Sequence, residues 1–214
     1  HKSFLSNLKN QDKIFVSRNG LNIKDLEVTE ERNPHRIIYA SSYDRGLVHL
    51  LDMWGDIRKE VPDAELHIYY GWNTYKEMME KGRRPRKFYD DMCALMKQDG
   101  VTEYGRIGQK KLAKEYTKSG IWAYPCHFEE ISCIGAMRGQ ATGAVPVTTL
   151  YAALQETVRF GTKVCMDVKG EDWSKYKDAL VIALKDTKLQ EEVRKEMIPW
   201  ARKTYNWSSI ASEW

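Results

Sequence analysis

Two adjacent carboxylates, Glu129 and Glu130, lie between a β-rich segment and a helix-like segment of the sequence. The segment 121–124 has strand character, and Pro125 ends it because proline has no amide hydrogen for a strand ladder. Ser132 is a typical helix N-cap residue. A carboxylate beside a helix N-terminus can accept hydrogen bonds from ligand hydroxyls, while the unpaired helix amides attract an anion. The segment therefore predicts a site for a ligand that carries both hydroxyls and negative charge.

The residues after the two carboxylates have the spacing of a helix followed by another strand. Ile134, Met137 and Ala141 recur with the period of a buried helix face. Gly143 is typical of the residue just past a helix end, and the segment 145–148 then has strand character. The carboxylates would thus lie at the carboxyl end of a strand, where α/β proteins bind their ligands.

The block from Tyr124 to Val147 resembles the nucleotide-sugar site of retaining glycosyltransferases of the GT-B fold, family 4. Pro125, Glu130, the glycine that ends the helix and the Pro-Val pair after it carry the resemblance. The hallmark of that family is two glutamates separated by seven residues, and Glu130 occupies the first place. Arg138 occupies the second place, which departs from the family pattern.

The resemblance implies donor-binding roles for this loop and for the start of the helix. Glu130 would bind the hydroxyls of the transferred sugar, and Ser132, Cys133 and Ile134 would lie against the donor phosphates. In the family the second acidic residue binds the ribose, but arginine has no acceptor atom and is permanently charged. We expect Arg138 instead to reach a phosphate or to pair with an acidic neighbour on the surface.

A second strand–loop–helix unit places a cation at a similar position. Segment 36–40 predicts a buried strand, and the small residues that follow it open a helix. In the resembled family a basic residue followed by glycine contacts the donor diphosphate, and Arg45-Gly46 matches that pattern. We therefore predict that Arg45 and Glu130 are the catalytic residues and that Ser42 and Gly46 bind the donor. The alternative is that Arg45 is a surface ion-pair residue.

Glycines follow two further predicted strands. Gly71 and Gly105 each come directly after one of these predicted strands. A glycine at such a position lets a ligand approach the backbone closely. By resemblance Gly71, Gly105, Arg106 and Ile107 belong to the donor site, with the loop from Gly105 holding the nucleobase. Trp72 would either line the donor cleft or pack on the helix below it.

Predicted strands and helices alternate along the chain. The strand candidates after the first 33 residues are 36–40, 64–70, 101–104, 121–124, 145–148 and 163–166. This alternation predicts an α/β fold, a Rossmann-like three-layer domain with a parallel sheet of about six strands. The remaining predicted elements are a helix at 1–10, a strand at 13–17, a largely helical segment at 74–96 that is interrupted at 81–87, and helices at 109–119, 151–160, 172–185 and 188–203. The loop after the first strand lacks a Gly-x-Gly-x-x-Gly fingerprint, which disfavours a dinucleotide oxidoreductase.

The resemblance also predicts a domain boundary. The Asn19-Gly20 turn lies where the family crosses from the acceptor domain into the donor domain, so residues 1–20 would be the end of an N-terminal domain and the crossover. Residues 21–214 would form the nucleotide-sugar-binding domain, the C-terminal half of a GT-B enzyme. That domain would begin with a polar linker at 21–33 and end with a crossover helix at 206–214.

Composition and charge exclude several classes of protein. The 214 residues suffice for one substantial α/β domain or two small ones. The net charge of +4, from 34 basic and 30 acidic residues, is too small an excess to indicate nucleic-acid binding. The four cysteines have no metal-ligand spacing, so we expect free buried thiols in a reducing compartment. No apolar run approaches the roughly 18 residues that span a membrane, and no signal peptide is recognisable, which favours a cytoplasmic location.

Segment 81–87 concentrates positive charge. Five of its seven residues are basic, and the other two are glycine and proline, which predicts an exposed loop. The loop would be either a solvated surface or a contact for an anionic acceptor or for anionic lipid headgroups at the inner membrane face.

The resemblance implies transfer of a sugar, with retention, from a nucleotide-diphosphate sugar to a saccharide, lipid or protein acceptor. The donor, linked to UDP or GDP, is a substrate, and we expect no cofactor and no metal because no Asp-x-Asp occurs. One alternative is a degenerate or donor-binding half that binds nucleotide sugar without turnover, since the acceptor domain expected ahead of residue 1 is not in the sequence and Arg138 replaces a glutamate. A nucleotide-sugar epimerase or isomerase is a second alternative, but the sequence shows no acid/base set for it.

Overall fold

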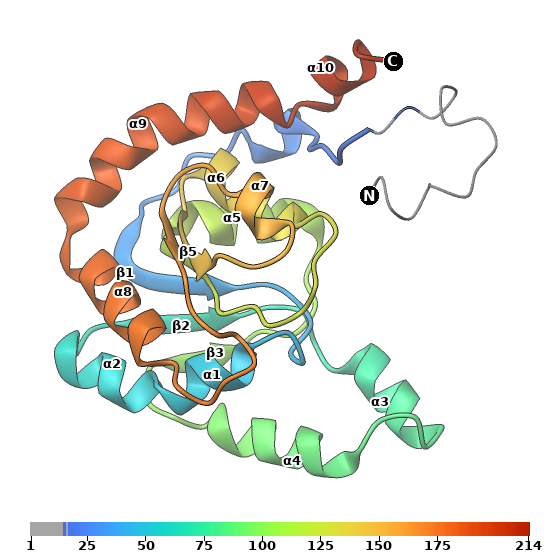
Figure 1. Ribbon diagram of the computed structural model, residues 1–214, viewed down its shortest axis with the longest axis vertical. Coiled ribbons are helices and arrows are strands. Elements are labelled where there is room, and N and C mark those ends of the chain that lie inside the picture. Colours follow the sequence, from blue (N-terminus) through green and yellow to red (C-terminus); the bar gives the residue numbers. More distant parts are fainter. Residues whose placement is uncertain (1–14, 16) are drawn as a thin grey trace.

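A parallel sheet forms the centre of the computed structural model, which describes residue 15 and residues 17–214. Within the described residues six strands lie in the order β3-β2-β1-β4-β5-β6, and every neighbouring pair is parallel (Figure 1). The strands are β1 (Asn33–Tyr39), β2 (Glu65–Ile68), β3 (Val101–Glu103), β4 (Ser119–Tyr124), β5 (Val145–Thr149) and β6 (Thr162–Val164). The predicted α/β Rossmann-like fold with about six parallel strands is confirmed.

The helices cover both faces of the sheet. The helices are η2 (Ile23–Leu26), α1 (Leu47–Asp52), α2 (Trp54–Glu60), α3 (Asn73–Glu80), α4 (Arg86–Leu95), α5 (Gln109–Lys118), α6 (Ile134–Thr142), α7 (Leu154–Thr157), α8 (Ser174–Lys185), α9 (Thr187–Thr204) and α10 (Trp207–Ala211). α5 contacts β1 and β4, and α6 lies against β4, β5 and α9. α1 contacts α2 and α4, and α2 contacts α8, which also packs on the sheet. Figure 1 shows α5 and α6 on one side of the sheet and α1, α2 and α4 on the other.

The central strands are buried because helices cover both of their faces. All six residues of β4 are buried, as are Ile37, Ile38 and Tyr39 of β1. Such strands read as continuous apolar runs rather than as alternating ones. In the sheet Ile38 lies beside His67 of β2 on one side and Trp122 of β4 on the other.

The predicted helix at 151–160 is wrong in its extent, since only α7 forms there. At its start, Ala152 has φ +46, which lies outside the helical region, so a helix cannot run through this residue. The amide of Ala153 donates to the carbonyl of Glu130, 3.1 Å away. At the other end, the amides of Arg159 and Phe160 donate to the side-chain oxygen of Gln140, at 3.0 and 3.2 Å. Tertiary partners therefore take the backbone groups that a longer helix would need.

The segment predicted as a polar linker contains structure of its own. η2 occupies Ile23–Leu26, and β1 already begins at Asn33. Leu21 joins the far end of the chain, since its amide donates to the carbonyl of Tyr205 at 2.6 Å and its carbonyl accepts from the Trp207 amide at 3.2 Å. The terminal helix predicted at 206–214 is confirmed as the shorter α10. The domain boundary at residue 20 stays a prediction, and the elements predicted at 1–10 and 13–17 lie wholly or mostly outside the described residues.

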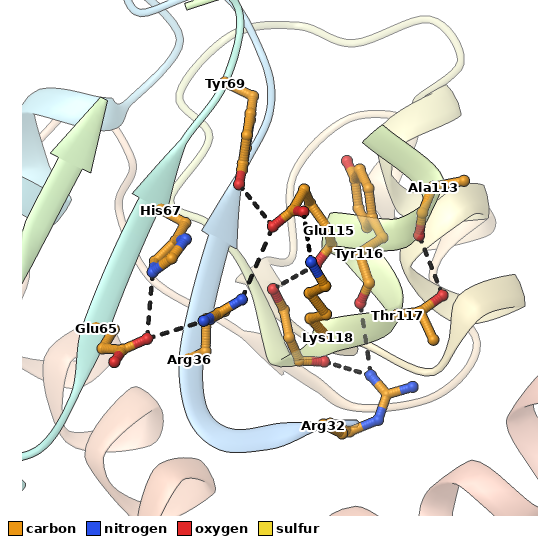
Figure 2. A network of polar contacts seen from close by, with 11 residues as sticks. Arg32, Arg36, Glu65, His67, Tyr69, Ala113, Glu115, Tyr116, Thr117 and Lys118 are labelled. Carbon is orange, nitrogen blue, oxygen red and sulfur yellow. Dashed lines mark hydrogen bonds and ion pairs between the residues drawn. The ribbon is translucent and has the colours of Figure 1, made fainter. Parts of the chain in front are cut away.

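A polar network joins α5 to the first two strands (Figure 2). Arg36 of β1 lies between two carboxylates, 3.1 Å from Glu65 and 3.8 Å from Glu115 of α5. The hydroxyl of Tyr69 also donates to Glu115, at 2.9 Å. Arg32 caps the end of α5, where it donates to backbone carbonyls including that of Ser119. Because Arg36, Tyr69 and Glu115 are all paired, their contacts can hold α5 in one position and thereby fix the loop that precedes the helix.

Candidate functional site

The loops after β1 and β4 start side by side because these two parallel strands are neighbours in the sheet, and the strand order reverses between them. In open α/β sheets this reversal separates the loops on the two sides and leaves a binding crevice at the carboxyl ends of the strands. Arg45 follows β1 and Glu130 follows β4. The topology therefore brings the two predicted catalytic residues to the same edge of the sheet.

Arg45, Glu130 and Tyr124 form one hydrogen-bonded cluster. The Arg45 guanidinium donates to Glu130 Oε1 at 2.9 Å, and the Tyr124 hydroxyl donates to the same oxygen at 2.6 Å. The Glu130 side chain is 9% exposed and that of Arg45 is 35% exposed. The hydroxyl groups of Ser41 and Tyr124 lie 3.2 Å apart and extend the cluster. A nearly buried carboxylate is thus held by one cation and one phenol, while the cation remains partly open to solvent.

Gly46 allows the two loops to approach this closely. Its φ is +103, in the left-handed region that favours glycine, and a Cβ at this position would overlap the carbonyl oxygen of Pro125. Gly46 also precedes α1 as its N-cap residue. The turn before it is fixed by the Ser42 hydroxyl, which donates to Asp44 at 2.6 Å, and by the Arg45 amide, which donates to the Ser42 carbonyl at 3.1 Å. The predicted roles of Ser42 and Gly46 in ligand binding stay predictions, but both shape the loop that carries Arg45.

Phe128 lies beneath the guanidinium of Arg45. The central carbon of the guanidinium is 4.2 Å from the centre of the Phe128 ring, a distance typical of cation–π contact. The ring itself is 43% exposed. Phe128 was not among the predicted site residues, and its position one residue before the acidic pair was the only available signal.

The cluster favours the charged form of its cation. Burial is the largest single influence on the pKa of the Arg45 guanidinium and would lower it, but the combined effects of Glu130 and Tyr124 raise the pKa above its usual value. Burial is the main cause that raises the pKa of the Tyr124 phenol, which therefore stays a hydrogen-bond donor near neutral pH. The cluster can therefore present one permanent cation to an anionic ligand.

The helix beside the cluster begins one residue later than predicted. Cys133, not Ser132, is the N-cap residue of α6, and no side chain caps this end of the helix. The first amide to bond back to the cap carbonyl is that of Met137, at 3.2 Å. The Ser132 prediction fails because the extended backbone of Cys133 (φ −94, ψ 94) places the helix start after it. The uncapped amides of residues 134–136 leave this helix end suited to an anion.

The cysteines near the site are protonated thiols. Burial raises the pKa of Cys126 to about 11 and that of Cys133 to about 12. Cys93 and Cys165 are also free, so the prediction of free thiols is confirmed for all four. The prediction that they are buried is wrong for Cys165, which is exposed, and only partly met for Cys93.

The loops after β2 and β3 are tied to each other through a buried tyrosine. The Tyr43 hydroxyl contacts the carboxylate of Glu103 at 2.5 Å and accepts from the Gly71 amide at 2.9 Å. The Gly105 amide donates to the same Glu103 oxygen at 3.0 Å. Gly71 and Gly105 both have positive φ, and a Cβ on Gly71 would lie 2.9 Å from the Arg106 amide nitrogen. Both glycines are therefore required by the backbone itself, which gives them a structural reason besides ligand approach.

The remaining residues of these loops have different surroundings. Arg106 is exposed and Ile107 is half-buried, and Ile107 packs against the main core. Trp72 is buried among aromatic rings, with the Tyr43 ring centre 4.6 Å away and that of Tyr89 4.8 Å away. Of the two alternatives for Trp72, packing is therefore confirmed.

Arg138 does not pair with an acidic neighbour among the described residues. Its guanidinium donates to the side-chain oxygen of Gln109 at 2.6 Å and lies 5.8 Å from the Tyr116 ring centre. Among the described residues it makes no ion pair, so the predicted pairing with an acidic neighbour is wrong. The physical reason is its place on α6, whose neighbour α5 offers an amide and an aromatic ring. Its buried Nε has no partner within the described part of the chain, and contact with a phosphate stays a prediction.

A histidine pair borders the cluster on the side of α8. His49 Nε2 and His127 Nδ1 are 3.2 Å apart, and the Trp173 ring stacks on His49 with centres 3.8 Å apart. Burial first, and the neighbouring His127 second, lower the pKa of His49 to about 4. The sequence placed His127 in a loop, but nothing in the sequence indicated that it would contact His49 of α1.

Two hollows lie outside the cluster. One of about 290 Å³ is lined by residues of α1, α2 and α8, including His49, Asp52 and Trp173. Another of about 420 Å³ lies between α2 and the segment before β3, lined by Trp54 and Gln98 among others. Neither contains Arg45 or Glu130. The chemistry of Arg45 and Glu130 therefore marks the site, at the carboxyl ends of the central strands β1 and β4, and a deep pocket does not.

The described residues contain no group of three or more His, Cys, Asp or Glu side chains placed to hold a metal ion, and the expectation of metal-independent chemistry stays a prediction. No helix in the described part of the chain is long and apolar enough to cross a lipid bilayer.

Several solved structures share the fold of this chain. Sucrose-phosphate synthase from Thermosynechococcus elongatus superposes with a TM-score of 0.74 at 18% identity, over 99% of this chain and 54% of that one. HepE of Anabaena in complex with UDP and glucose superposes with a TM-score of 0.75 at 11% identity, over 99% of this chain and 58% of HepE. The pneumococcal O-GlcNAc transferase GtfA in complex with UDP and GlcNAc superposes with a TM-score of 0.65 at 14% identity, over 92% of this chain and 37% of GtfA.

These likenesses concern the fold. No protein-family model matches the sequence, and no curated protein matches it either. The chain spans between about a third and three fifths of the length of the three structures compared. The Rossmann-like α/β fold of this chain is therefore one that occurs in GT-B glycosyltransferases.

Proposed function

We propose that this chain is the donor-binding domain of a glycosyltransferase that takes its sugar from a nucleotide-diphosphate sugar. The observation that carries the proposal is the Arg45–Glu130–Tyr124 cluster at the carboxyl edge of the sheet, beside the uncapped end of α6. A cation and helix amides suit a diphosphate, and a carboxylate next to them suits sugar hydroxyls. Neighbours in fold were solved with UDP or UDP-glucose, which supports a nucleotide-sugar donor.

The charges of the cluster suit the reaction. As the bond from the sugar to the diphosphate breaks, negative charge grows on the leaving phosphate oxygen. Arg45 and the amides at residues 134–136 would stabilise that charge, which is how preorganised donors lower a barrier. Glu130 would accept hydrogen bonds from sugar hydroxyls and so orient the ring. Retention of configuration, membership of family 4 and the position of this domain in the C-terminal half of an enzyme belong to the same proposal.

Arg138 distinguishes this site from the pattern it resembles. The side chain lies beside Gln109, at the end of the loop that begins at Gly105. An arginine there can donate to a phosphate or stack on a planar base, but it cannot accept a hydrogen bond from a ribose hydroxyl. We expect the nucleoside to be held mainly by backbone groups of the 105–108 loop.

A thermal-shift screen tests the proposal. UDP, GDP and ADP, each with and without a linked hexose, would be added to the purified chain, since a ligand that binds only the native state raises the melting temperature. We expect at least one diphosphate to raise it and the linked sugar to change the rise. If every nucleotide left the melting temperature unchanged at millimolar concentration, the proposal would be refuted.

The second candidate is a module that binds nucleotide sugar without turning it over on its own. Arginine at position 138, where the resembled pattern has a glutamate, favours it. Incubation of the chain with the donor found in the screen and with saccharide, lipid or peptide acceptors separates the two. Sugar transfer or release of nucleoside diphosphate would rule out the second candidate, and binding without either product would support it.

A further inference from the structure

The connection between α3 and α4 carries charge that the proposed transfer does not use. We define the α3–α4 tip as residues 81–87, of which every residue is exposed. Five of the seven are basic. Figure 1 shows α3 and this connection at the outer edge of the molecule, away from α9. No residue of α3 is buried, so this helix owes little of its position to the core.

Two cations of the tip have no carboxylate partner. Arg86 and Lys87 pair with Asp90 and Asp91 one turn further along α4, at 3.5 and 2.6 Å. These side chains are all more than half exposed, and such surface pairs contribute little and exchange readily. Lys81 and Arg83 make no ion pair within the described residues, although Glu77 and Glu80 precede them on α3.

An apolar side chain adjoins these cations. Met78 is 39% exposed, and its carbonyl accepts a hydrogen bond from the Arg83 amide at 2.8 Å. An exposed methionine at the end of α3 is therefore joined through the backbone to the tip, whose Lys81 and Arg83 make no ion pair within the described residues. This pairing of an apolar side chain with lysine or arginine suits the boundary between lipid headgroups and acyl chains.

The tip is linked to the candidate site through one arginine. Arg84 pairs with Asp44 at 2.9 Å, and Asp44 accepts from the Ser42 hydroxyl in the turn that carries Arg45. The Tyr75 hydroxyl donates to the Pro85 carbonyl at 3.0 Å and closes the hairpin. A surface that binds the tip would therefore lie next to the loop after β1.

We propose that the α3–α4 tip docks on an anionic lipid surface. The residues of the tip are spread over an outward connection and do not converge, whereas a small anion needs several donors around one point. An extended anionic surface can contact all of them at once. Each cation near such a surface strengthens binding by roughly fivefold, and the effect is lost at high salt because charges are screened. The proposal does not depend on which nucleotide or sugar the site takes.

Co-sedimentation with vesicles tests the proposal. Wild type is expected to sediment with phosphatidylcholine vesicles that contain phosphatidylglycerol, to stay in solution with pure phosphatidylcholine, and to be released by high salt. The double substitution Lys81→Ser with Arg83→Ser should weaken the partition about tenfold or more. The matched control is Lys188→Ser with Lys195→Ser, which removes the same charge from exposed positions on α9.

Several outcomes would overturn the proposal. Equal sedimentation with neutral vesicles would remove the electrostatic argument, and an equal loss in the control variant would show that only net charge matters. Tight binding of soluble inorganic polyphosphate without sedimentation on anionic vesicles would identify a soluble polyanion as the partner. The Met78→Ser substitution adds an independent readout, since it should reduce the partition while the charge stays unchanged. Circular dichroism of each variant checks that the fold is intact.

Discussion

Substitutions of the two partners in the Arg45–Glu130 ion pair should have opposite effects on the affinity for a nucleoside diphosphate. In this structure the guanidinium of Arg45 is bonded to Glu130, so a diphosphate must compete with that carboxylate. Glu130→Gln removes a negative charge from a side chain that is 9% exposed while the Tyr124 hydroxyl keeps an acceptor. It frees the cation and removes repulsion of the ligand. We therefore expect Arg45→Ala to weaken binding of a free nucleoside diphosphate and Glu130→Gln to strengthen it.

The contacts set the size of both effects. A hydrogen bond to a charged group contributes about 1.5–3 kcal/mol, and part of that is already used by Glu130. Arg45→Ala should therefore cost about 1–3 kcal/mol, which is roughly a 5- to 150-fold rise in Kd. The gain from Glu130→Gln is limited by solvent screening to about 1 kcal/mol, or roughly a fivefold tighter Kd.

Isothermal titration calorimetry with the nucleotide found by thermal shift measures both constants. The same titration with the sugar-linked nucleotide gives a second readout, because Glu130→Gln should lose any affinity that the hexose adds. Arg18→Ala is the matched control, since Arg18 also forms an ion pair with a single carboxylate, that of Glu213 at 2.6 Å, and neither residue belongs to the cluster. It should leave both constants unchanged.

Two results would refute the reasoning. If Arg45→Ala bound the free nucleotide as tightly as wild type, Arg45 would have no role in phosphate binding. If Glu130→Gln weakened the free nucleotide as much as Arg45→Ala does, the pair would act as a structural unit and not as competitors for the cation. Denaturant unfolding of each variant separates these outcomes from simple loss of the fold.

Three further predictions concern the surroundings of the cluster. Gly46→Ala should cost about 3 kcal/mol or more in denaturant unfolding, because the left-handed backbone and the Pro125 carbonyl leave no room for a Cβ. As pH falls from 6.5 toward 4, the free energy of unfolding of wild type should fall by about 1–2 kcal/mol more than that of His49→Gln. In this pH range His49 stays neutral in the folded protein, whereas the same histidine takes up a proton in the unfolded chain. The same pH dependence in both proteins would contradict this. Arg84→Ala should speed hydrogen exchange at the α3–α4 tip by up to about fivefold, since its pair with Asp44 is a partly exposed one; unchanged exchange would mean that the pair does not hold the tip.

Local sequence signals predicted most of the sheet and its loops. All six strands were predicted, and the central strands β1 and β4 contain apolar runs because a strand buried on both faces needs a continuous apolar segment. Gly143, with φ +92 just past α6, marked the helix end for a reason that acts within one turn. The prediction failed where the competing partners are distant. Ala153 and Phe160 bond to residues outside their own segment, so the helix expected around them is short.

For the candidate site, too, the sequence predicted the local features, and distant contacts decided the rest. The sequence alone determined that Arg45 and Glu130 each follow a buried strand, and parallel strands put such residues on one edge. Only the tertiary structure decided that the two side chains bond to each other across 85 positions of the chain, with Phe128 beneath the cation. It also decided that Arg138 turns to Gln109 and that His49 meets His127. Periodicity and turn chemistry act over a few residues, whereas the contacts that set charge and hydrogen bonding in this site depend on how strands are ordered and helices packed.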